Sequence, residues 1–194
     1  HQVVSKTIIS LLDSHLESYS IVEGSEDIIN KFKVEHSIEK IDVVHSYFEN
    51  FTTSKKYDAI EMGFVLEHVD DPKLVINTFK EFLSPNGVMF ISVPNAKSLH
   101  RLIGKKAGLL ENIYKLSEYD LQLGHKRYFD IDRLCNLIKE CNLKIEDKKG
   151  LMLKPITGEQ IRILGWEESI ISALMDIGED YPEMANCIYI EAIK

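Results

Sequence analysis

The sequence predicts an α/β protein whose core is a doubly wound, mostly parallel sheet. Short apolar runs alternate with helical stretches along the chain, which is the order of elements that builds such a sheet. The run Val88–Val93 is apolar almost without interruption, as expected of a strand covered on both faces. Two later segments, Leu143–Asp147 and Cys187–Ile193, alternate between apolar and polar residues and predict half-buried strands.

The composition fits one globular domain over residues 1-194, because 44% of the residues are hydrophobic and can form a sizeable core. The formal net charge of -8 disfavours a broad phosphate-binding surface, since nucleic-acid binders usually carry a basic face. We therefore expect a small-molecule substrate and no nucleic-acid partner, and we leave a homodimer open.

The cysteines and the hydropathy bear on the compartment. Cys135, Cys141 and Cys187 are too few and too scattered for a disulfide framework, and they lack the spacing of a zinc site. No apolar run approaches the roughly 20 residues that span a bilayer. The first residues show no basic-then-apolar signal pattern. We expect a cytoplasmic protein that has no membrane contact.

The first part of the chain predicts one helix and three short strands. Apolar residues at helical spacing indicate a helix over residues 5–16, carried by Ile8, Leu12 and Leu16. The strand candidates are Ser20–Val22, Ile41–Val44 and Tyr57–Met62.

The pair Asp71-Pro72 predicts the start of the next helix, because Asp can cap free N–H groups and Pro fits the first helical position. The expected apolar stripe of this helix consists of Leu74, Val75, Thr78, Phe79, Phe82 and Leu83. Ser84–Gly87 has the composition of a turn, and Pro94 is expected to end the strand that follows it.

The remaining chain predicts two irregular segments around one clear helix. Residues 97-123 show no clean period and are expected to hold short helices or a mobile lid beside the substrate. Asp130 can cap a helix whose apolar face is Ile131, Leu134, Cys135, Ile138 and Cys141. Residues 154-186 are expected to form a helical insertion before the last strand.

Glu23 ends the second strand of the predicted sheet, provided that one strand precedes the first helix. In doubly wound folds an acid at that place accepts hydrogen bonds from two ribose hydroxyls. Such a site also needs a glycine-rich turn after the first strand, and the first glycine here is Gly24. We therefore expect that the given sequence begins just after the glycine turn and that the first strand is missing.

Two stretches carry a resemblance to a known family. They are YDAIEMGFVLEHVDDPKLVINTFKEFLSPNGVMFISVPN from Tyr57 and GHKRYFDIDRLCNLIKECNLKI from Gly124. Together they resemble class I S-adenosylmethionine-dependent methyltransferases, particularly the ubiquinone-biosynthesis type, over about Ser5–Leu153. The resemblance implies a Rossmann-like fold that ends in an antiparallel hairpin, into which Cys187–Ile193 fits beside Leu143–Asp147. It also implies S-adenosylmethionine as cofactor.

The resemblance also implies the cofactor-binding residues. The acid at the end of the second strand holds the cofactor ribose in the family, which points to Glu23 and the adjacent Gly24. The residues beside the adenine would be His45, Ser46 and Tyr47, and those beside the methionine moiety would be Met62, Gly63 and Phe64.

The chain departs from the family at an acidic motif. Ubiquinone-type enzymes carry ExxEH, which resembles a divalent-metal site, but here Phe64 replaces the first acid and leaves Glu67 and His68. Two ligands seldom make a site by themselves, so we expect no metal. His68 is a candidate catalytic residue, and an equally good interpretation is that Glu67 and His68 order the turn before Asp71.

The cluster GHKRY contains the leading candidates for acceptor chemistry. A hydroxyl nucleophile needs a base, for which His125 is suited, whereas an anionic acceptor needs a cation such as Arg127. Tyr128 would line the substrate beside them. Asn95 and His100, after the strand that ends at Pro94, are further substrate-binding candidates. The alternative is that the GHKRY stretch has no functional role and is a solvated run of charges next to a helix.

The sequence thus predicts an enzyme that moves a methyl group from S-adenosylmethionine to an oxygen of a small molecule. The GHKRY stretch is similar to one in methyltransferases of surface-glycan gene clusters. This resemblance suggests capsule or glycan biosynthesis and a sugar or phosphorylated acceptor. Two alternatives are a nicotinamide-dependent Rossmann oxidoreductase, because an acid after the second strand serves ribose there too, and a non-catalytic methyltransferase-like partner subunit.

Overall fold

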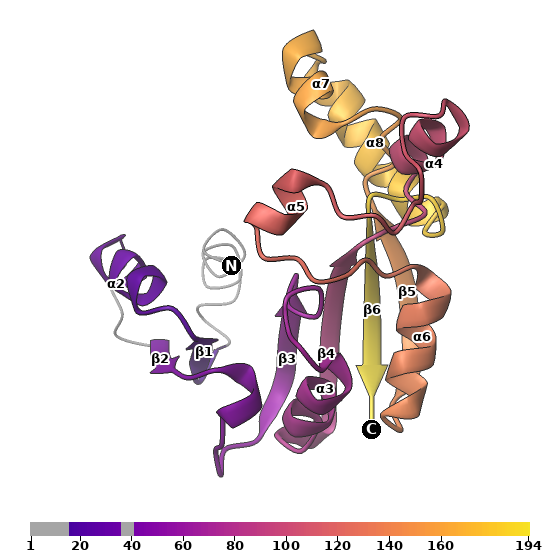
Figure 1. The fold of residues 1–194 in the computed structure, drawn as a ribbon. Coiled ribbons are helices and arrows are strands. Elements are labelled where there is room, and N and C mark those ends of the chain that lie inside the picture. Colours follow the sequence, from indigo (N-terminus) through magenta and orange to yellow (C-terminus); the bar gives the residue numbers. More distant parts are fainter. Residues whose placement is uncertain (1–15, 36–40) are drawn as a thin grey trace. The chain divides into compact units, whose positions relative to one another are not determined.

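The computed structural model describes residues 16–35 and 41–194, which fall into two compact units, His1–Ser54 and Lys55–Lys194 (Figure 1). The helix predicted over residues 5–16 falls on residues 1–15 except for its last position, and so lies outside the described part. None of the helices in the described ranges is long and apolar enough to cross a bilayer.

The first unit is a parallel strand pair with one helix. Strand β1 (Tyr19–Glu23) pairs with β2 (Ile41–His45) so that Glu23 lies opposite His45. Helix α2 (Glu26–Glu35) connects them and buries Ile29 and Phe32. A 3-10 turn, η1 (Phe48–Asn50), follows β2. Both predicted strands are confirmed here, and their parallel direction places both carboxyl ends at one edge.

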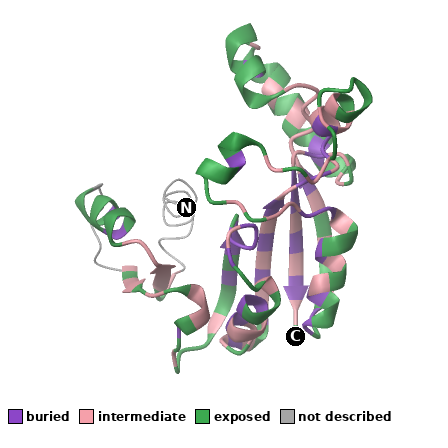
Figure 2. Cartoon of the chain, in the orientation of Figure 1, coloured by how far each residue is buried: buried purple, intermediate pink, exposed green. Residues whose placement is uncertain are grey.

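The second unit contains a four-stranded sheet in the order β3-β4-β6-β5, made of β3 (Tyr57–Gly63), β4 (Leu83–Pro94), β6 (Cys187–Ile193) and β5 (Lys144–Leu151). Strands β3 and β4 are parallel, whereas β6 runs antiparallel to both of its neighbours. The α/β class and the antiparallel end of the sheet are therefore confirmed. Figure 2 shows buried residues concentrated on the inner strands. The fully buried residues of β4 and β6 include Met89, Ile91, Val93, Ile188, Ile190 and Ala192.

Helix α3 (Pro72–Lys80) begins as predicted, because the Asp71 side chain accepts a hydrogen bond of 3.0 Å from the Leu74 N–H. Its apolar stripe differs from the predicted one. Leu74 is 47% exposed, and Ile76, which the prediction left out, is fully buried. The buried stripe is Val75, Ile76 and Phe79.

The helix is also shorter than predicted, since Leu83 belongs to β4 and pairs with Tyr57. The next pairing of these two strands joins Ala59 to Val88, so that Ser84–Gly87 bulges out of the ladder. A Cβ atom on Gly87 would lie 2.8 Å from the Tyr57 carbonyl oxygen, and therefore only glycine fits at this bulge. The segment Ser84–Gly87, which was predicted to be a turn, is a bulge within β4.

Helix α6 (Ile131–Glu140) begins at Asp130, whose carboxylate accepts from the Arg133 N–H at 2.8 Å, and it buries Leu134 and Ile138 as predicted. Two short helices, α4 (Leu99–Lys106) and α5 (Glu118–Gln122), lie within residues 97–123. Whether this segment acts as a lid stays a prediction.

Two further helices, α7 (Gly158–Leu164) and α8 (Glu168–Asp180), lie within residues 154–186. Helix α8 packs closely on the end of β5. A Cβ atom on Gly178 would lie 2.4 Å from the Met152 backbone nitrogen, and one on Gly150 would lie 2.3 Å from the Gly178 oxygen. The two glycines therefore permit backbone contact between helix and strand.

Candidate functional site

In the first unit, the predicted ribose- and adenine-binding residues gather at the carboxyl ends of β1 and β2. The Glu23 carboxylate accepts from the Ser25 N–H at 2.8 Å, and the Glu23 carbonyl accepts from the Ser46 N–H at 3.0 Å. The His45 ring lies 3.1 Å from the Gly24 oxygen through Nε2. Tight turns at both strand ends therefore hold these residues together.

Tyr47 lies against Gly24 in the same unit. A Cβ atom on Gly24 would lie 3.1 Å from Tyr47 Cδ1, whereas the tyrosine is 68% exposed overall. A tyrosine ring exposed beside a carboxylate offers a stacking surface next to a hydrogen-bond acceptor. This pairing suits a nucleoside, and the assignment of these residues stays a prediction.

In the second unit, β3 ends in a constrained turn made of the residues predicted to lie beside the methionine moiety. Met62 and Gly63 are buried, and Phe64 is 38% exposed. Phe64 has φ 56, in the left-handed region that few residues other than glycine adopt. Its N–H donates to the Ser92 oxygen at 2.8 Å. The chain therefore holds an exposed aromatic ring in a strained backbone position.

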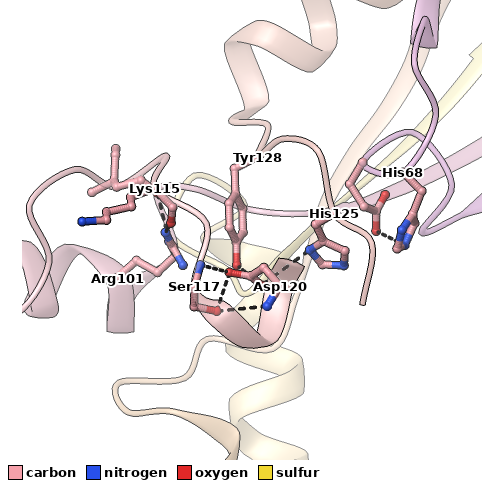
Figure 3. A network of polar contacts seen from close by, with 9 residues as sticks. His68, Arg101, Lys115, Ser117, Asp120, His125 and Tyr128 are labelled. Atoms are coloured by element: carbon pink, nitrogen blue, oxygen red, sulfur yellow. Dashed lines mark hydrogen bonds and ion pairs between the residues drawn. The ribbon is translucent and has the colours of Figure 1, made fainter. Parts of the chain in front are cut away.

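Three side chains that can bind protons or metals meet just after this turn: Glu67, His68 and His125. His68 Nε2 lies 3.9 Å from Glu67 Oε1, and the two imidazole centroids lie 4.7 Å apart at 78° (Figure 3). The candidate ligand atoms all lie within 4.8 Å of one another. The expectation of no metal rested on two ligands, and the structure brings a third candidate ligand, His125, beside them. The absence of a metal stays a prediction.

Glu67 is fully buried, and neither of its carboxylate oxygens has a hydrogen-bond partner within the described ranges. Burial raises the pKa of the Glu67 carboxyl to about 7, because a desolvated carboxylate is unfavourable. Burial also lowers the pKa of His68. The cluster can therefore exchange a proton near neutral pH.

His125 faces a carboxylate that the sequence reasoning missed. Its Nδ1 lies 3.5 Å from Asp120 Oδ1, at the outer limit of hydrogen bonding, so we treat the contact as electrostatic (Figure 3). Gly124, with φ 80, lies in the turn between Asp120 and His125. In this turn the backbone N–H of His125 donates to the backbone carbonyl oxygen of Asp120 at 2.9 Å.

Asp120 is in turn well supplied with donors. It accepts 2.7 Å hydrogen bonds from the Ser117 N–H and hydroxyl, and a 3.0 Å bond from the Tyr128 hydroxyl. Burial acts against ionisation, but these hydrogen bonds hold the pKa of Asp120 below its usual value. The S-x-x-D pattern at Ser117 is a helix capping signal, which could have indicated Asp120 from the sequence.

Tyr128 is packed beneath Arg101. The guanidinium carbon of Arg101 lies 4.0 Å from the centroid of the Tyr128 ring. Arg101 is only 9% exposed, and it donates to the carbonyl oxygens of Ile113 at 3.0 Å and Lys115 at 2.6 Å (Figure 3). The Arg101 guanidinium is thus buried and held by backbone carbonyl oxygens. The sequence pattern did not predict this burial.

Two predicted substrate contacts have their polar atoms engaged with backbone. The Arg127 guanidinium donates to the carbonyl oxygens of Leu66, Val69 and Asp70. The amide of Asn95 donates at 2.9 Å to both the Glu183 and Ala185 oxygens, and its oxygen accepts from the Lys97 N–H. Both side chains hold backbone segments in place, and their contact with a substrate stays a prediction.

His100, the remaining candidate, lies in the first turn of α4. Its Nδ1 is buried and has no hydrogen-bond partner in the part of the chain that the structure describes. Burial first, and then the charges of Lys154 and Arg101, lower the pKa of His100 to about 4. The imidazole is therefore neutral at physiological pH.

Comparison with known proteins identifies related chains. A family model described as "Methyltransferase domain" matches residues 10–148. The ubiquinone biosynthesis O-methyltransferase of Actinobacillus pleuropneumoniae is 30% identical over 122 residues, which cover 59% of this chain and 48% of that protein. The mitochondrial counterpart of Schizosaccharomyces pombe is 26% identical, over 60% of this chain and 42% of that protein. The chain thus spans about half the length of these curated relatives.

Solved structures share the fold at low sequence identity. An S-adenosylmethionine-dependent methyltransferase from Mesorhizobium loti matches with a TM-score of 0.65 at 14% identity, covering 96% of this chain and 85% of that one. The plantazolicin methyltransferase BamL, solved with a triazolic desmethylPZN analog and SAH, matches with a TM-score of 0.62 at 14% identity, over 97% and 73% of the two chains. These similarities show the fold.

Proposed function

The chain belongs to the methyltransferase domain family, and from this premise we propose that it transfers the methyl group of S-adenosylmethionine to an oxygen of a small molecule. The match of the family model over residues 10–148 is the observation that carries the proposal. The oxygen acceptor rests on the curated relatives, which are named O-methyltransferases.

The described residues support a cofactor role in each unit. In the first unit, the Glu23 carboxylate at the end of β1 would accept hydrogen bonds from the ribose hydroxyls, and the exposed Tyr47 ring would stack on the adenine. In the second unit, the turn Met62–Phe64 would contact the methionine portion. When bound, the cofactor supplies an activated methyl group on a sulfonium whose sulfur is a good leaving group.

The protein then needs to orient the acceptor and remove its proton. His125 is placed for the second task. Because Nδ1 faces the Asp120 carboxylate, the tautomer with its proton on Nδ1 is favoured and Nε2 is left as the base. The acceptor hydroxyl would give its proton to Nε2 as its oxygen takes the methyl group, and Asp120 would stabilise the imidazolium that forms.

A second candidate for activating the acceptor is a divalent cation held by Glu67, His68 and His125. The unpartnered oxygens of Glu67 favour it, and nitrogen with carboxylate ligands suits zinc or a similar ion. Tetrahedral ligands lie about 3.4 Å apart, so the side chains would have to close by an ångström or more from their spacing of up to 4.8 Å. Such an ion would lower the pKa of a hydroxyl bound to it.

The two candidates differ in their response to metal. If a cation is held, Zn²⁺ raises the melting temperature of the wild-type chain, and His68→Ala removes that effect. If His125 acts as the base alone, neither Zn²⁺ nor a chelator changes the melting temperature or the turnover.

The other functions weighed from the sequence are not favoured. The comparisons place the chain in a methyltransferase family, which disfavours the nicotinamide-dependent oxidoreductase. The curated relatives are named for ubiquinone biosynthesis, so we do not carry the surface-glycan acceptor further. A non-catalytic subunit would fail the following test.

Isothermal titration with S-adenosylhomocysteine tests the proposal directly. We expect the folded chain to bind this product, and we expect Glu23→Gln to weaken binding about tenfold or more, because hydrogen bonds to a charged acceptor are lost. Glu17→Gln, which changes an exposed acid in the same unit, is the matched control. Absence of binding by the folded chain, and also by a form that includes the expected glycine turn, would contradict the proposal, and equal affinities of the two variants would remove Glu23 from it.

A further inference from the structure

A groove between α6 and β5 lies outside the candidate site. The helix and the strand lie side by side (Figure 1), and the groove between them has a volume of about 370 Å³. Small-molecule sites in proteins span roughly 300–1,000 Å³, so the groove is large enough for a small ligand. None of the residues that line it was predicted to bind the cofactor or the acceptor, and none belongs to the cluster around Glu67 and His125.

Lys148 faces this groove because of a bulge in β5. The pairing of β5 with β6 shifts by one residue between Ile145 and Asp147, so that Lys148 lies opposite Ile190. Ile190 is fully buried, and residues opposite one another on paired strands share a face of the sheet. Because one residue of register separates the two faces, the bulge turns Lys148 toward the face that carries the buried apolar side chains. Lys148 and Ile145 thereby line the same groove.

The groove is lined by two lysines, Lys139 and Lys148, that lack an ion pair in the described chain. Every acid of α6 and β5 forms an ion pair with a different lysine: Asp132 with Lys97 at 3.1 Å, Glu140 with Lys73 at 2.9 Å, Glu146 with Lys144 at 2.5 Å and Asp147 with Lys149 at 3.7 Å. Arg133 lies over the Tyr114 ring at 3.8 Å. The two cations of these elements that have no such partner among the described residues are therefore the two that line the groove.

Two ammonium groups on one groove create a local positive potential. Water satisfies a single exposed ammonium, but like charges that face the same hollow repel one another until an anion lies between them. The acid in the lining, Asp132, is already paired with Lys97. The side-chain amide of Asn136 adds a neutral donor. The groove therefore favours an anion although the chain has a net charge of -8, since charges beyond a Debye length are largely screened.

The other lining residues favour a small molecule that has an apolar part. Ile131 and Ile145 contribute one aliphatic side chain from each element. A peptide that adds a strand to β5 is disfavoured, because the bulge interrupts the regular edge. In addition, the Lys148 N–H already donates to the Asp147 side chain at 2.8 Å and is not available to such a strand.

We propose that the groove between α6 and β5 binds a small oxyanion that carries an aliphatic chain, either a carboxylate or a phosphate monoester. Lys139 and Lys148 would bind the oxyanion, and Asn136 would donate to it. The aliphatic chain would lie against Ile131 and Ile145. This site goes beyond the proposed function and does not depend on it, because the lining includes none of the residues proposed for the cofactor or the acceptor.

Cys135 serves as a reporter of the groove, because it is half-buried in the lining whereas Cys141 and Cys187 are buried. Burial raises the pKa of the Cys135 thiol, so its alkylation by iodoacetamide is followed by mass spectrometry at about pH 8.5. Hexanoate and hexyl phosphate are titrated separately at constant ionic strength. We expect at least one of them to slow the alkylation of Cys135 with a saturable dependence, and the half-protection concentrations distinguish carboxylate from phosphate.

Hexanol and acetate test the two parts of the ligand. Hexanol lacks the charge and acetate lacks most of the aliphatic chain, so each should need a concentration at least about tenfold higher for half protection. Equal protection by hexanol would overturn the oxyanion, and equal protection by acetate would overturn the apolar contact. Absence of saturable protection by both hexanoate and hexyl phosphate would overturn the site.

Lys148→Met removes one ammonium group and keeps the apolar stem. We expect it to raise the half-protection concentration about tenfold or more. Lys144→Met is the matched control and should leave that concentration unchanged, because Lys144 is an exposed lysine of the same strand that does not line the groove. Equal changes in the two variants would show general charge attraction and would overturn the site.

The half-protection concentration is compared in place of the alkylation rate itself, since the loss of a nearby cation also changes the reactivity of the Cys135 thiol. Lys144 and Lys148 are both exposed, so both variants should fold, and urea denaturation checks this.

Discussion

Glu67 is a carboxylic acid placed where water does not reach it. The residues on both sides of it, Leu66 and His68, are held by the turn after β3, and the Glu67 carbonyl accepts from the Lys126 N–H at 2.8 Å. The backbone therefore fixes the Glu67 side chain next to His68 and His125, even if the carboxyl group makes no favourable interaction there. Such a residue costs stability, and strongly perturbed pKa values of this kind cluster at functional sites.

This cost predicts a pH dependence. The folded pKa of Glu67, about 7, lies above its unfolded value of 4.5, so the unfolded chain ionises first as the pH rises. The free energy of unfolding should therefore fall between about pH 4.5 and 7, by up to about 3 kcal/mol from this residue. Glu67→Gln should lose that fall, so that its stability relative to wild type grows over the same range.

Urea denaturation from pH 4 to 8 with a chelator present measures the effect. Glu179→Gln, an exposed change on α8, serves as the control and should follow the wild-type curve. Parallel curves for wild type and Glu67→Gln would contradict the raised pKa.

Phe64 is strained because its φ of 56 brings Cβ close to the following carbonyl oxygen. Phe64→Gly removes both the strain and the ring, whereas Phe64→Ala removes the ring alone. We expect the glycine variant to be more stable than the alanine variant by about 1 kcal/mol in urea denaturation. If the ring contacts the cofactor, both variants should bind S-adenosylhomocysteine equally weakly. A more stable alanine variant would show that the backbone relaxes.

At the level of secondary-structure elements, short helices and turns position polar side chains that do not lie on the sheet strands. Helix α5 has only five residues, yet its capping box orients Asp120. Helix α8 meets the end of β5 through two glycines, one in each element. Both devices act through backbone geometry and leave little trace in hydrophobic periodicity.

The capping box predicts the effect of Asp120→Asn. Asparagine keeps one acceptor oxygen, which can serve Ser117 or Tyr128 but not both, because these donors use different carboxylate oxygens. It also removes the charge that would stabilise the His125 imidazolium. With any acceptor that the wild type methylates, we expect kcat to fall about tenfold or more and KM to stay within a factor of a few. Ser117→Ala disturbs the cap and keeps the carboxylate, so it should reduce stability more than turnover. The reverse order would make Asp120 a purely structural residue.

The close approach of α8 predicts opposite effects of the same substitution at two helical glycines. Gly178→Ala should destabilise the chain by about 2 kcal/mol, because the new Cβ atom would lie 2.4 Å from the Met152 nitrogen. Gly104→Ala in α4 should stabilise it by about 0.5–1 kcal/mol, since its Cβ atom would meet Leu110 at an ordinary 3.7 Å. Thermal or urea unfolding compares them, and equal changes would contradict the packing described here.

At the scale of the molecule, the chain is acidic overall, yet its second unit withdraws individual cations from solvent. The net charge is -8, whereas Arg101 is only 9% exposed and Lys154 is half-buried. The composition argues against a broad basic face, and this stays a prediction. It could not predict these buried cations, because a few cations withdrawn from solvent do not alter the totals.

Most strands and two helix starts could be predicted from the sequence, because they depend on local chemistry. Short apolar runs or apolar–polar alternation marked each strand of the described chain, and the Asp71 and Asp130 caps marked two helix starts, because strand period and capping depend on neighbouring residues. The family resemblance was likewise readable in LEHVDDP and FISVPN. Helix α3 was overextended because Leu83 continues its apolar spacing, and only pairing with Tyr57 decides that it starts a strand.

Only the tertiary structure decided which polar groups meet. His68 and His125 are far apart in the chain, and their contact depends on the turn at Gly124 and on the Lys126 bond to Glu67. Arg127 was predicted to bind substrate because it is a cation in a polar motif, but in the structure its guanidinium donates to backbone carbonyl oxygens. The partial burial of Lys154 was not predicted, because a lone lysine after a strand has the sequence pattern of a solvated residue. Burial and pairing arise from contacts distant in sequence, which no local pattern encodes.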